Sequence, residues 1–286
     1  TLDKQGKPAI PRIAIRMQGD GIFETRGVAD GDQNLEGNMA DIAEKKMNEL
    51  PGAEKYRQAS ADMKLLTVIE KKTKAGEKLN KDELIFLYEI DSPIKYFGYQ
   101  KDPRIGEIRE TRNHKEDAPI VFGCAPEEIA WKKEDIAKST RAYVGPLFKG
   151  IFQKNIENIY TSFPEERIFG FEAELGGRTE NEIKSELENR KNSEGRDIIY
   201  ISDNAKSMLK KPEFFVLKKK EQAQFVKLKV KDLGFPSGAT TEEIYKKLED
   251  LGLELCPPET GPTIRLNYEK IFKKEQPRNE YLYIAM

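Results

Sequence analysis

The spacing of the apolar residues changes part-way along this chain of 286 residues, and that change limits its fold more than any other sequence feature. In the first part, apolar side chains such as Tyr56, Ala59 and Met63 recur every three or four residues, which is the period of an amphipathic helix. Beyond about residue 120, short apolar runs separated by turn residues predominate, which is typical of strands. The sequence therefore predicts an α+β protein with a mainly helical domain followed by a mixed α/β domain with short strands.

The first predicted domain spans residues 1–115 and consists of a β-hairpin followed by helices. Apolar residues alternate on either side of the turn at Gly19 and Gly21, which predicts the hairpin over 13–29. Four helices are expected to follow, from their capping residues and apolar stripes. They begin near Asn38, Ala53, Asn80 and Asp102. The polar stretch 111–119 is predicted to be a loop that ends this domain.

The second predicted domain spans residues 120–286 and has a further internal boundary near 212–224. Capping-box sequences at Thr179 and Thr240 predict the starts of two helices. The run 198–201 is expected to be either a strand or the apolar entry to a helix that Ser202 or Asp203 caps. Strands are predicted at 120–122, 142–147, 156–161, 225–231, 253–255 and 263–268.

The charge and hydropathy of the chain exclude some classes of function. There are 49 basic and 50 acidic residues, with a formal net charge of −1, so a polycation that binds nucleic acid over its whole surface is excluded. No run of about 18 apolar residues is present, so neither a membrane span nor a membrane partner is predicted. Two cysteines and the lack of a signal-like segment indicate a reducing, cytoplasmic location.

Residues that commonly carry chemistry are few. The single histidine, His114, lies in a polar stretch and is predicted to be a solvated loop residue rather than a catalytic base. Cys124 and Cys256 lie in apolar runs and are predicted to be buried free thiols. These three residues lack the paired spacing of a zinc site, and the acidic stretch 30–34 departs from the pattern of a calcium loop. The sequence therefore predicts no metal and no cofactor, and it singles out no catalytic residue.

A run of lysines is the first candidate interaction surface. Residues 206–231 contain nine lysines and two glutamates, a local excess of seven positive charges. Apolar residues and lysines alternate over 225–231, which predicts an edge strand with one lysine face. Three interpretations of these lysines are open. They keep a solvated sheet edge from pairing with other strands, or they bind an acidic protein. In the third, they bind nucleic acid, with Phe214, Phe215 and Phe225 as stacking partners. We define the lysine strip as Lys210, Lys211, Lys218, Lys219, Lys220, Lys227, Lys229 and Lys231.

The proline-rich segment 256–262 is the second candidate. Its prolines and Gly261 predict a rigid loop that presents Glu259 and Thr260 to a ligand, with Arg265 close by. The alternative is a structural connection between a helix and a strand. The aromatic segment 96–99 is a third candidate, either as a stacking surface for a base or peptide or as part of the helical core.

Three parts of the sequence carry a family resemblance. The first contains MKLLTVIEKKTKAGEKLNKDELIFLYEID and FGYQKDPRIGEIRETRN, and the second contains AYVGPLFKGIFQKNIENIYTSFPEERI. The third contains LGFPSGATTEEIYKKLEDLGLELCPPETGPTIRLNY and QPRNEYLYIAM. Together they resemble modules of large, uncharacterised proteins from the genomes of uncultured candidate-phylum bacteria. The resemblance implies a modular architecture, and it brings no activity, cofactor or catalytic residue with it.

These observations favour a non-catalytic modular protein that binds another protein in the cytoplasm. Histidine is almost absent, and no Gly-rich phosphate loop of the P-loop type is present. The first alternative is a metal-dependent nuclease or toxin-like enzyme, because catalysis by Asp, Glu and Lys needs no histidine. Acidic pairs such as Glu165 and Glu166 do not by themselves define its site. The second alternative is a nucleic-acid-binding protein that uses the lysine strip.

Overall fold

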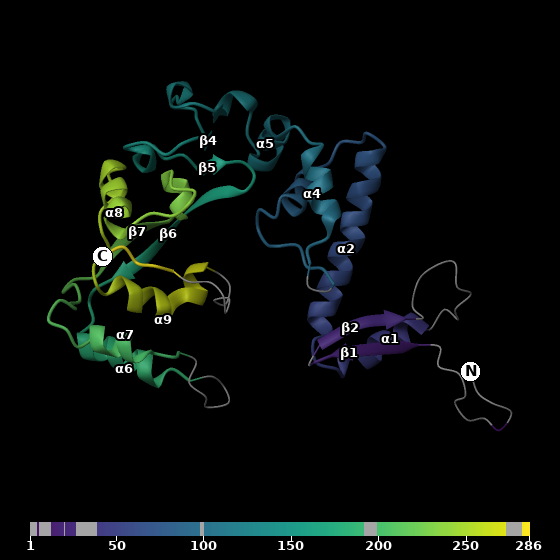
Figure 1. Cartoon of the computed structure of the whole chain (residues 1–286), viewed down its shortest axis with the longest axis horizontal. Coiled ribbons are helices and arrows are strands. Elements are labelled where there is room, and N and C mark those ends of the chain that lie inside the picture. Colours follow the sequence, from purple (N-terminus) through teal and green to yellow (C-terminus); the bar gives the residue numbers. More distant parts are fainter. Residues whose placement is uncertain are drawn as a thin grey trace. The chain divides into compact units, whose positions relative to one another are not determined.

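The computed structural model of this chain describes residues 5, 13–19, 21–26, 39–97, 100–191, 199–272 and 282–286. The chain divides by its contacts into two compact units, Thr1–Gly123 and Cys124–Met286, coloured along the sequence in Figure 1. Helices and strands are both present, which confirms the predicted α+β class. The acidic stretch 30–34, Gly98, Tyr99 and Ile198 lie outside the described residues.

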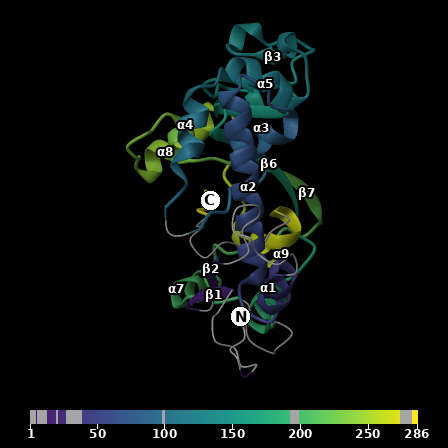
Figure 2. The ribbon, with the colours of Figure 1, turned by 90° about the vertical axis from the view of Figure 1, so that its right-hand side faces the viewer.

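The first unit begins with the predicted hairpin. Strands β1 (Ala14–Gln18) and β2 (Gly21–Arg26) pair antiparallel. The helices α1 (Met39–Asn48) and α2 (Ala53–Lys74) follow, as the apolar period predicts. The backbone N–H of Thr25 donates a hydrogen bond to the hydroxyl of Tyr56 at 3.2 Å, which joins β2 to α2. Figure 2 shows the hairpin and α1 near one end of α2.

The remaining described helices of the first unit are α3 (Lys81–Leu87), α4 (Pro103–Glu110) and α5 (His114–Phe122). The predicted capping box of α3 is present, since the side chain of Asn80 accepts from the backbone N–H of Glu83 and the reverse bond also forms, both at 2.9 Å. α2 packs against α4, and α3 packs against α5. The fully buried core side chains of this unit include Leu66, Ile69, Leu84, Leu87 and Ile105.

Helix α5 shows that two predictions are wrong, namely the loop at 111–119 and the strand at 120–122. The side chain of Asn113 caps the helix by accepting from the backbone N–H of Lys115 at 3.1 Å, and Gly123 ends it in the left-handed conformation with φ 64°. The polar first turn and Pro119 obscure the helical period, because only a short stretch of this helix is apolar. The first unit therefore runs to Gly123.

A mixed five-stranded sheet organises the described part of the second unit, in the order β3-β4-β5-β6-β7. β4 is parallel to both β3 and β5, whereas β6 is antiparallel to both β5 and β7. The strands are β3 (Ile129–Ala130), β4 (Ala142–Val144), β5 (Asn158–Ser162), β6 (Glu166–Leu175) and β7 (Glu221–Lys227). β6 is the longest, and it is not among the predicted strands, although Phe169, Phe171 and Ala173 alternate with other residues.

The described helices of the second unit are α6 (Glu180–Asn189), α7 (Asp203–Met208), α8 (Thr241–Asp250) and α9 (Thr260–Phe272). The predicted capping boxes of α6 and α8 are present, and Ser202 caps α7. Of the described helices in both units, none is long and apolar enough to cross a membrane.

The two strands predicted near the end of the chain are wrong. Residues 253–255 have no strand partner in the described part of the chain, and 263–268 belongs to α9. Ile264, Leu266 and Tyr268 are all buried, so this helix is covered on more than one side. Its apolar residues therefore repeat every second position and imitate a strand.

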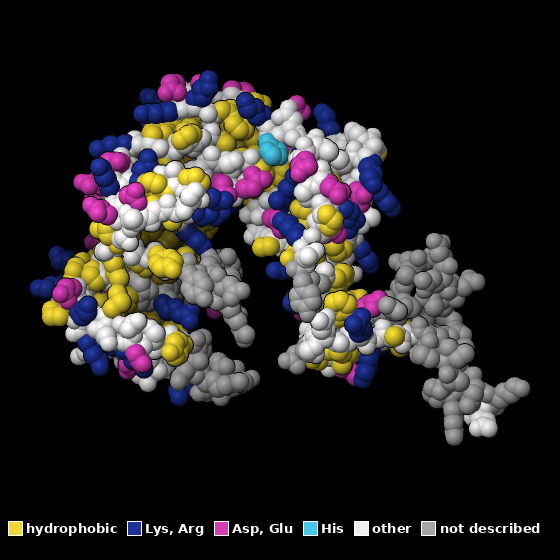
Figure 3. Space-filling view, in the orientation of Figure 1, with side chains coloured by type: hydrophobic (Ala, Val, Ile, Leu, Met, Phe, Trp, Pro, Cys, Tyr) yellow, Lys and Arg dark blue, Asp and Glu magenta, His cyan; other side chains and the backbone are white. Residues whose placement is uncertain are grey.

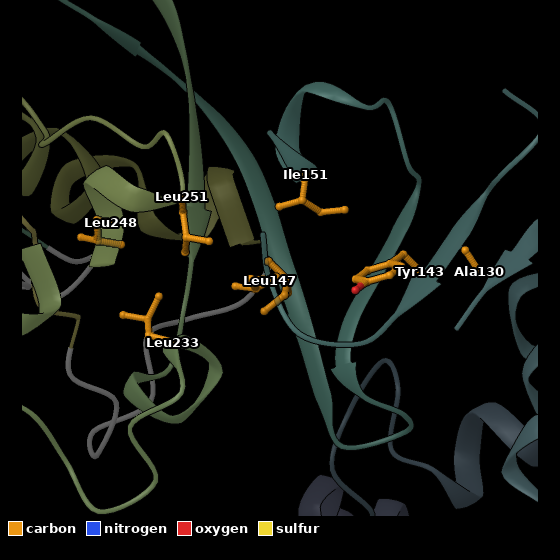
Figure 4. Close-up of a cluster of buried hydrophobic side chains, with 8 residues drawn as sticks. Ala130, Tyr143, Leu147, Ile151, Leu233, Leu248 and Leu251 are labelled. Atoms are coloured by element: carbon orange, nitrogen blue, oxygen red, sulfur yellow. The ribbon is translucent and has the colours of Figure 1, made fainter. Parts of the chain in front are cut away.

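Two apolar clusters stabilise the second unit. One joins the sheet to α8 and includes Tyr143, Leu147, Ile151 and Leu251, and Figure 4 shows Leu147 between the α8 side and the sheet side. The other joins α6, α9 and the chain around α7, through Ile183, Leu187, Ile199, Phe214 and Leu266. α9 also packs on β6. These clusters hold the surfaces around α7 and α8 in place.

Candidate functional site

The structure does not place Lys227, Lys229 and Lys231 on one face of a strand. β7 ends at Lys227, and the chain then turns into a short 3₁₀ helix over Val230–Leu233. The carboxylate of Asp232 accepts from the backbone N–H of Lys229 at 2.8 Å, which caps this turn. The predicted strand 225–231 is therefore correct only up to Lys227, although β7 does lie at the edge of the sheet.

Lys220, Lys229 and Lys231 of the lysine strip bind described carboxylates. The Nζ atoms of Lys229 and Lys231 lie 2.9 and 2.5 Å from the two carboxylate oxygens of Glu166, whose side chain is only 13% exposed. Burial by itself raises the pKa of Glu166, but the hydrogen bonds from Lys231 and Lys229 outweigh it, so the pKa lies below its usual value. Lys220 binds Glu174 at 2.8 Å. These pairs were not apparent from the sequence, because their partners lie on β6.

A cluster of aromatic rings occupies the face of β6 and β7 that α9 covers. Phe225 is opposite Phe171 in the strand register, and their rings stack with centroids 5.3 Å apart. Phe272 of α9 lies 5.1 Å from Phe171, and the Nζ of Lys227 lies 5.9 Å from the Phe272 ring. Phe225 and Lys227 therefore contact this cluster, so the prediction that Phe225 serves nucleic-acid stacking is not supported by its position.

The other four residues of the lysine strip are exposed, and the structure pairs none of them with a described carboxylate. They lie on either side of two phenylalanines that differ in burial. Phe214 is 7% exposed and packs in the core, whereas Phe215 is 49% exposed. The four are Lys210, Lys211, Lys218 and Lys219.

The predicted ligand loop 256–262 is a half-buried connection whose last three residues belong to α9. Glu259 and Thr260 are fully buried, so neither is presented to a ligand. The Glu259 carboxylate accepts hydrogen bonds from the backbone N–H groups of Gly176 and Leu217, at 2.9 and 2.7 Å. We call this arrangement the Glu259 clamp. Gly261 lies in the first turn of α9, and Arg265 is exposed on the same helix. The sequence did not reveal the clamp, because a glutamate between prolines resembles a surface residue.

A buried charged cluster joins α3 and α5 in the first unit. Arg112 donates two hydrogen bonds of 2.6 Å to the carboxylate of Asp117, and the hydroxyl of Tyr88 donates to the same carboxylate. Asp117 and Tyr88 are each 3% exposed. The ring of His114 meets the Tyr88 ring edge-on, with centroids 5.6 Å apart. His114 is thus a half-buried first residue of a helix, and its prediction as a solvated loop residue is wrong.

The hydroxyl of Tyr88 should make stability depend on pH. Burial raises its pKa, and the hydrogen bond to Asp117 raises it further. Above the ordinary tyrosine pKa of about 10, the unfolded chain loses this proton while the folded chain keeps it. The free energy of unfolding is therefore expected to fall as pH rises, by up to about 1.4 kcal/mol per pH unit from this group.

Tyr88→Phe removes this titration, so its free energy of unfolding should fall less steeply above pH 10 than that of the wild type. Urea unfolding at a series of alkaline pH values measures the difference. Tyr200→Phe, at a tyrosine that is 86% exposed, is the matched control and should follow the wild type. Equal slopes for Tyr88→Phe and the wild type would contradict the assignment.

Cysteine and acidic residues provide no assembled site in the described part of the chain. Cys124 and Cys256 are free and half-buried, and burial raises the pKa of both thiols. Among the residues that the structure describes, no three His, Cys, Asp or Glu side chains lie together as metal ligands would. In the described part of the aromatic segment, Phe97 packs against Tyr56 with ring centroids 5.0 Å apart and is 41% exposed, so this residue is only partly in the core.

A groove lies beside α8 in the second unit. One side is the face of α8 that carries Tyr245, and the other is formed by residues 253–255, which follow the helix and have no regular secondary structure. Its volume is about 780 Å³. Leu255 contributes an apolar side chain that is 46% exposed. The groove is lined by Thr241, Glu242, Tyr245, Lys246, Glu249, Leu253, Glu254 and Leu255.

The chain 282–286 already lies against this part of the molecule. The backbone N–H of Cys256 donates to the carbonyl of Ala285 at 2.6 Å, and the hydroxyl of Tyr245 donates to the carbonyl of Met286 at 3.1 Å. This stretch has no regular secondary structure. The neighbourhood of the groove therefore holds a non-helical segment through both backbone and side-chain hydrogen bonds.

Charge is distributed unevenly around the groove. Its lining contains three glutamates and one lysine, so its formal net charge is −2. Figure 3 shows acidic and basic side chains close together over α8 and over much of the same view. An apolar wall with a negative rim favours a ligand that is both apolar and positively charged.

No protein-family model matches this chain, and no curated protein or solved structure matches it either.

Proposed function

We propose that this protein is a non-catalytic interaction protein, and that its second unit binds an extended, positively charged segment of another protein in the groove beside α8. The observation that carries the proposal is the combination of an exposed Leu255 with a glutamate-rich rim in one groove. Contiguous exposed apolar patches rimmed by polar residues mark interaction surfaces, and Leu253 lines the same groove as Leu255. The negative rim selects lysine or arginine in the partner.

The form of the partner follows from the walls of the groove. The chain after α8 has no regular secondary structure, and Tyr245 and Cys256 bind the non-helical segment 282–286 close by. An extended peptide presents alternate side chains to opposite sides, so it can place apolar residues on Leu253 and Leu255 and basic residues on the glutamates. We therefore expect a partner sequence in which Leu, Ile or Val alternates with Lys or Arg.

A selection of random linear peptides displayed on phage, with the full chain as target, tests this proposal. The enriched peptides are expected to show the alternating pattern. Leu255→Asp should weaken their binding about tenfold or more, because burying a leucine contributes about 1.5–3 kcal/mol and each 1.4 kcal/mol corresponds to tenfold. Isothermal titration calorimetry with the synthetic peptides measures the change.

Val68→Asp in α2 is the matched control, since Val68 is 45% exposed and Leu255 is 46% exposed. This control should bind the peptides with the wild-type Kd. The double variant Glu249→Lys with Glu254→Lys should lose binding to basic peptides while it retains its fold by circular dichroism. The proposal is wrong if no peptide family is enriched, or if the enriched peptides bind Leu255→Asp as tightly as Val68→Asp.

A further inference from the structure

A second surface of this unit has a different chemistry. Residues 210–220 contain five lysines and a single acid, Glu213, so this stretch carries a formal net charge of +4. One of the five, Lys220, binds Glu174, whereas the other four are exposed and have no described carboxylate as an ion-pair partner. The stretch therefore concentrates positive charge in a protein that is close to neutral as a whole.

The backbone of this stretch is held on both sides of Phe215. On one side, the backbone N–H groups of Lys211 and Phe214 donate to the carbonyls of Met208 and Lys211, at 3.1 and 3.0 Å. On the other side, Leu217 donates to Glu259 at 2.7 Å and accepts from the backbone N–H of Gly177 at 2.9 Å. The lysines therefore extend from an ordered backbone, which lowers the entropy lost when they bind a ligand.

Burial separates the roles of the two phenylalanines. Phe214 packs in the core with Ile183 and Leu187, so it anchors the stretch. Phe215 is the next residue and is 49% exposed. The result is an exposed aromatic ring with lysines four and five residues before it and three and four residues after it.

We propose that Phe215 with Lys210, Lys211, Lys218 and Lys219 forms a binding surface for single-stranded nucleic acid. The ring stacks on a base, and the lysines neutralise phosphates on either side of that base. An acidic protein would satisfy the lysines, but it would leave the exposed ring without a flat partner. None of these residues lines the α8 groove, so this surface and the peptide site can be tested separately.

The test measures binding of a fluorescent oligothymidylate to the full chain by anisotropy, over salt concentrations from about 0.05 to 0.2 M. For single strands, the slope of the logarithm of the binding constant against the logarithm of the salt concentration decreases in magnitude by about 0.7 for each phosphate contact removed. The triple variant Lys210→Gln, Lys211→Gln, Lys218→Gln is therefore expected to lower the slope by about 2. Phe215→Ala should weaken binding about 5- to 100-fold and leave the slope unchanged, because it removes stacking without charge.

The chain supplies a matched control for charge. The triple variant Lys220→Gln, Lys229→Gln, Lys231→Gln removes the same number of charges from lysines that already bind Glu174 and Glu166. Its salt slope should remain close to that of the wild type. Equal loss of slope in the two triple variants would overturn the proposal, as would wild-type affinity in Phe215→Ala or an undetectable complex at low salt. Displacement of the oligonucleotide by an equal charge concentration of poly-glutamate would assign the surface to an acidic protein instead.

Discussion

Glu259→Ala is expected to destabilise the second unit by about 3 kcal/mol or more. The substitution removes the acceptor of two backbone N–H groups, those of Gly176 and Leu217, and each unsatisfied buried donor costs about 1–3 kcal/mol. It also leaves a cavity where a fully buried side chain was packed. Trp131 is the single tryptophan and lies in the second unit, so its fluorescence during urea unfolding should report the change.

Glu254→Ala is a suitable control, because Glu254 is an exposed glutamate five residues earlier. It should change the free energy of unfolding by less than about 0.5 kcal/mol. The free energy of unfolding of Glu259→Gln should lie between those of Glu259→Ala and Glu254→Ala. The amide keeps one acceptor oxygen, but it turns an N–H group toward the second backbone donor. Similar unfolding midpoints for Glu259→Ala and Glu254→Ala would show that the clamp contributes little.

Asp117→Ala should destabilise the first unit by about 3–5 kcal/mol, because it leaves the guanidinium of Arg112 partly buried without its counterion. The hydroxyl of Tyr88 loses the Asp117 carboxylate as an acceptor at the same time. The first unit contributes helices α1 to α5, so far-UV circular dichroism during urea unfolding is the appropriate measurement. Glu116→Ala, at the exposed neighbouring position of α5, is expected to have a much smaller effect.

A second substitution separates the charge from the packing. If the unpaired guanidinium causes most of the loss, adding Arg112→Met to Asp117→Ala should recover part of the free energy of unfolding. If the two substitutions are additive, the free energy of unfolding of the double variant is lower than that of Asp117→Ala by the amount that Arg112→Met causes alone. That result would contradict this explanation. In that case the cluster would contribute through packing rather than through the ion pair.

Local signals in the sequence identified most helix starts. A capping box needs only residues three positions apart, so Asn80, Thr179 and Thr240 could be recognised without knowledge of the fold. α5 and α9 were misread for a different reason, which is that their apolar residues do not follow one face. A polar first turn with an internal proline disguised α5, and burial on several sides disguised α9.

The candidate site was less predictable, because it depends on residues that meet only in the fold. The lysine strip could be found from its composition, but the ion pairs of Lys229 and Lys231 with Glu166 span more than sixty residues of sequence. The sequence of the lysine strip alone therefore does not show that Glu166 neutralises Lys229 and Lys231. Conversely, no sequence motif marks the groove beside α8, because the groove forms only where residues 253–255 lie beside the helix.

The Glu259 clamp also bears on the order in which the second unit assembles. Its carboxylate meets backbone groups that are 83 and 42 residues away along the chain, so it can form only after β6, the approach to β7 and the start of α9 have come together. Contacts of such large sequence separation slow folding, because the loops between them must close first. We infer that α9 docks late in folding. The clamp then mainly lowers the rate at which this helix detaches from the native structure.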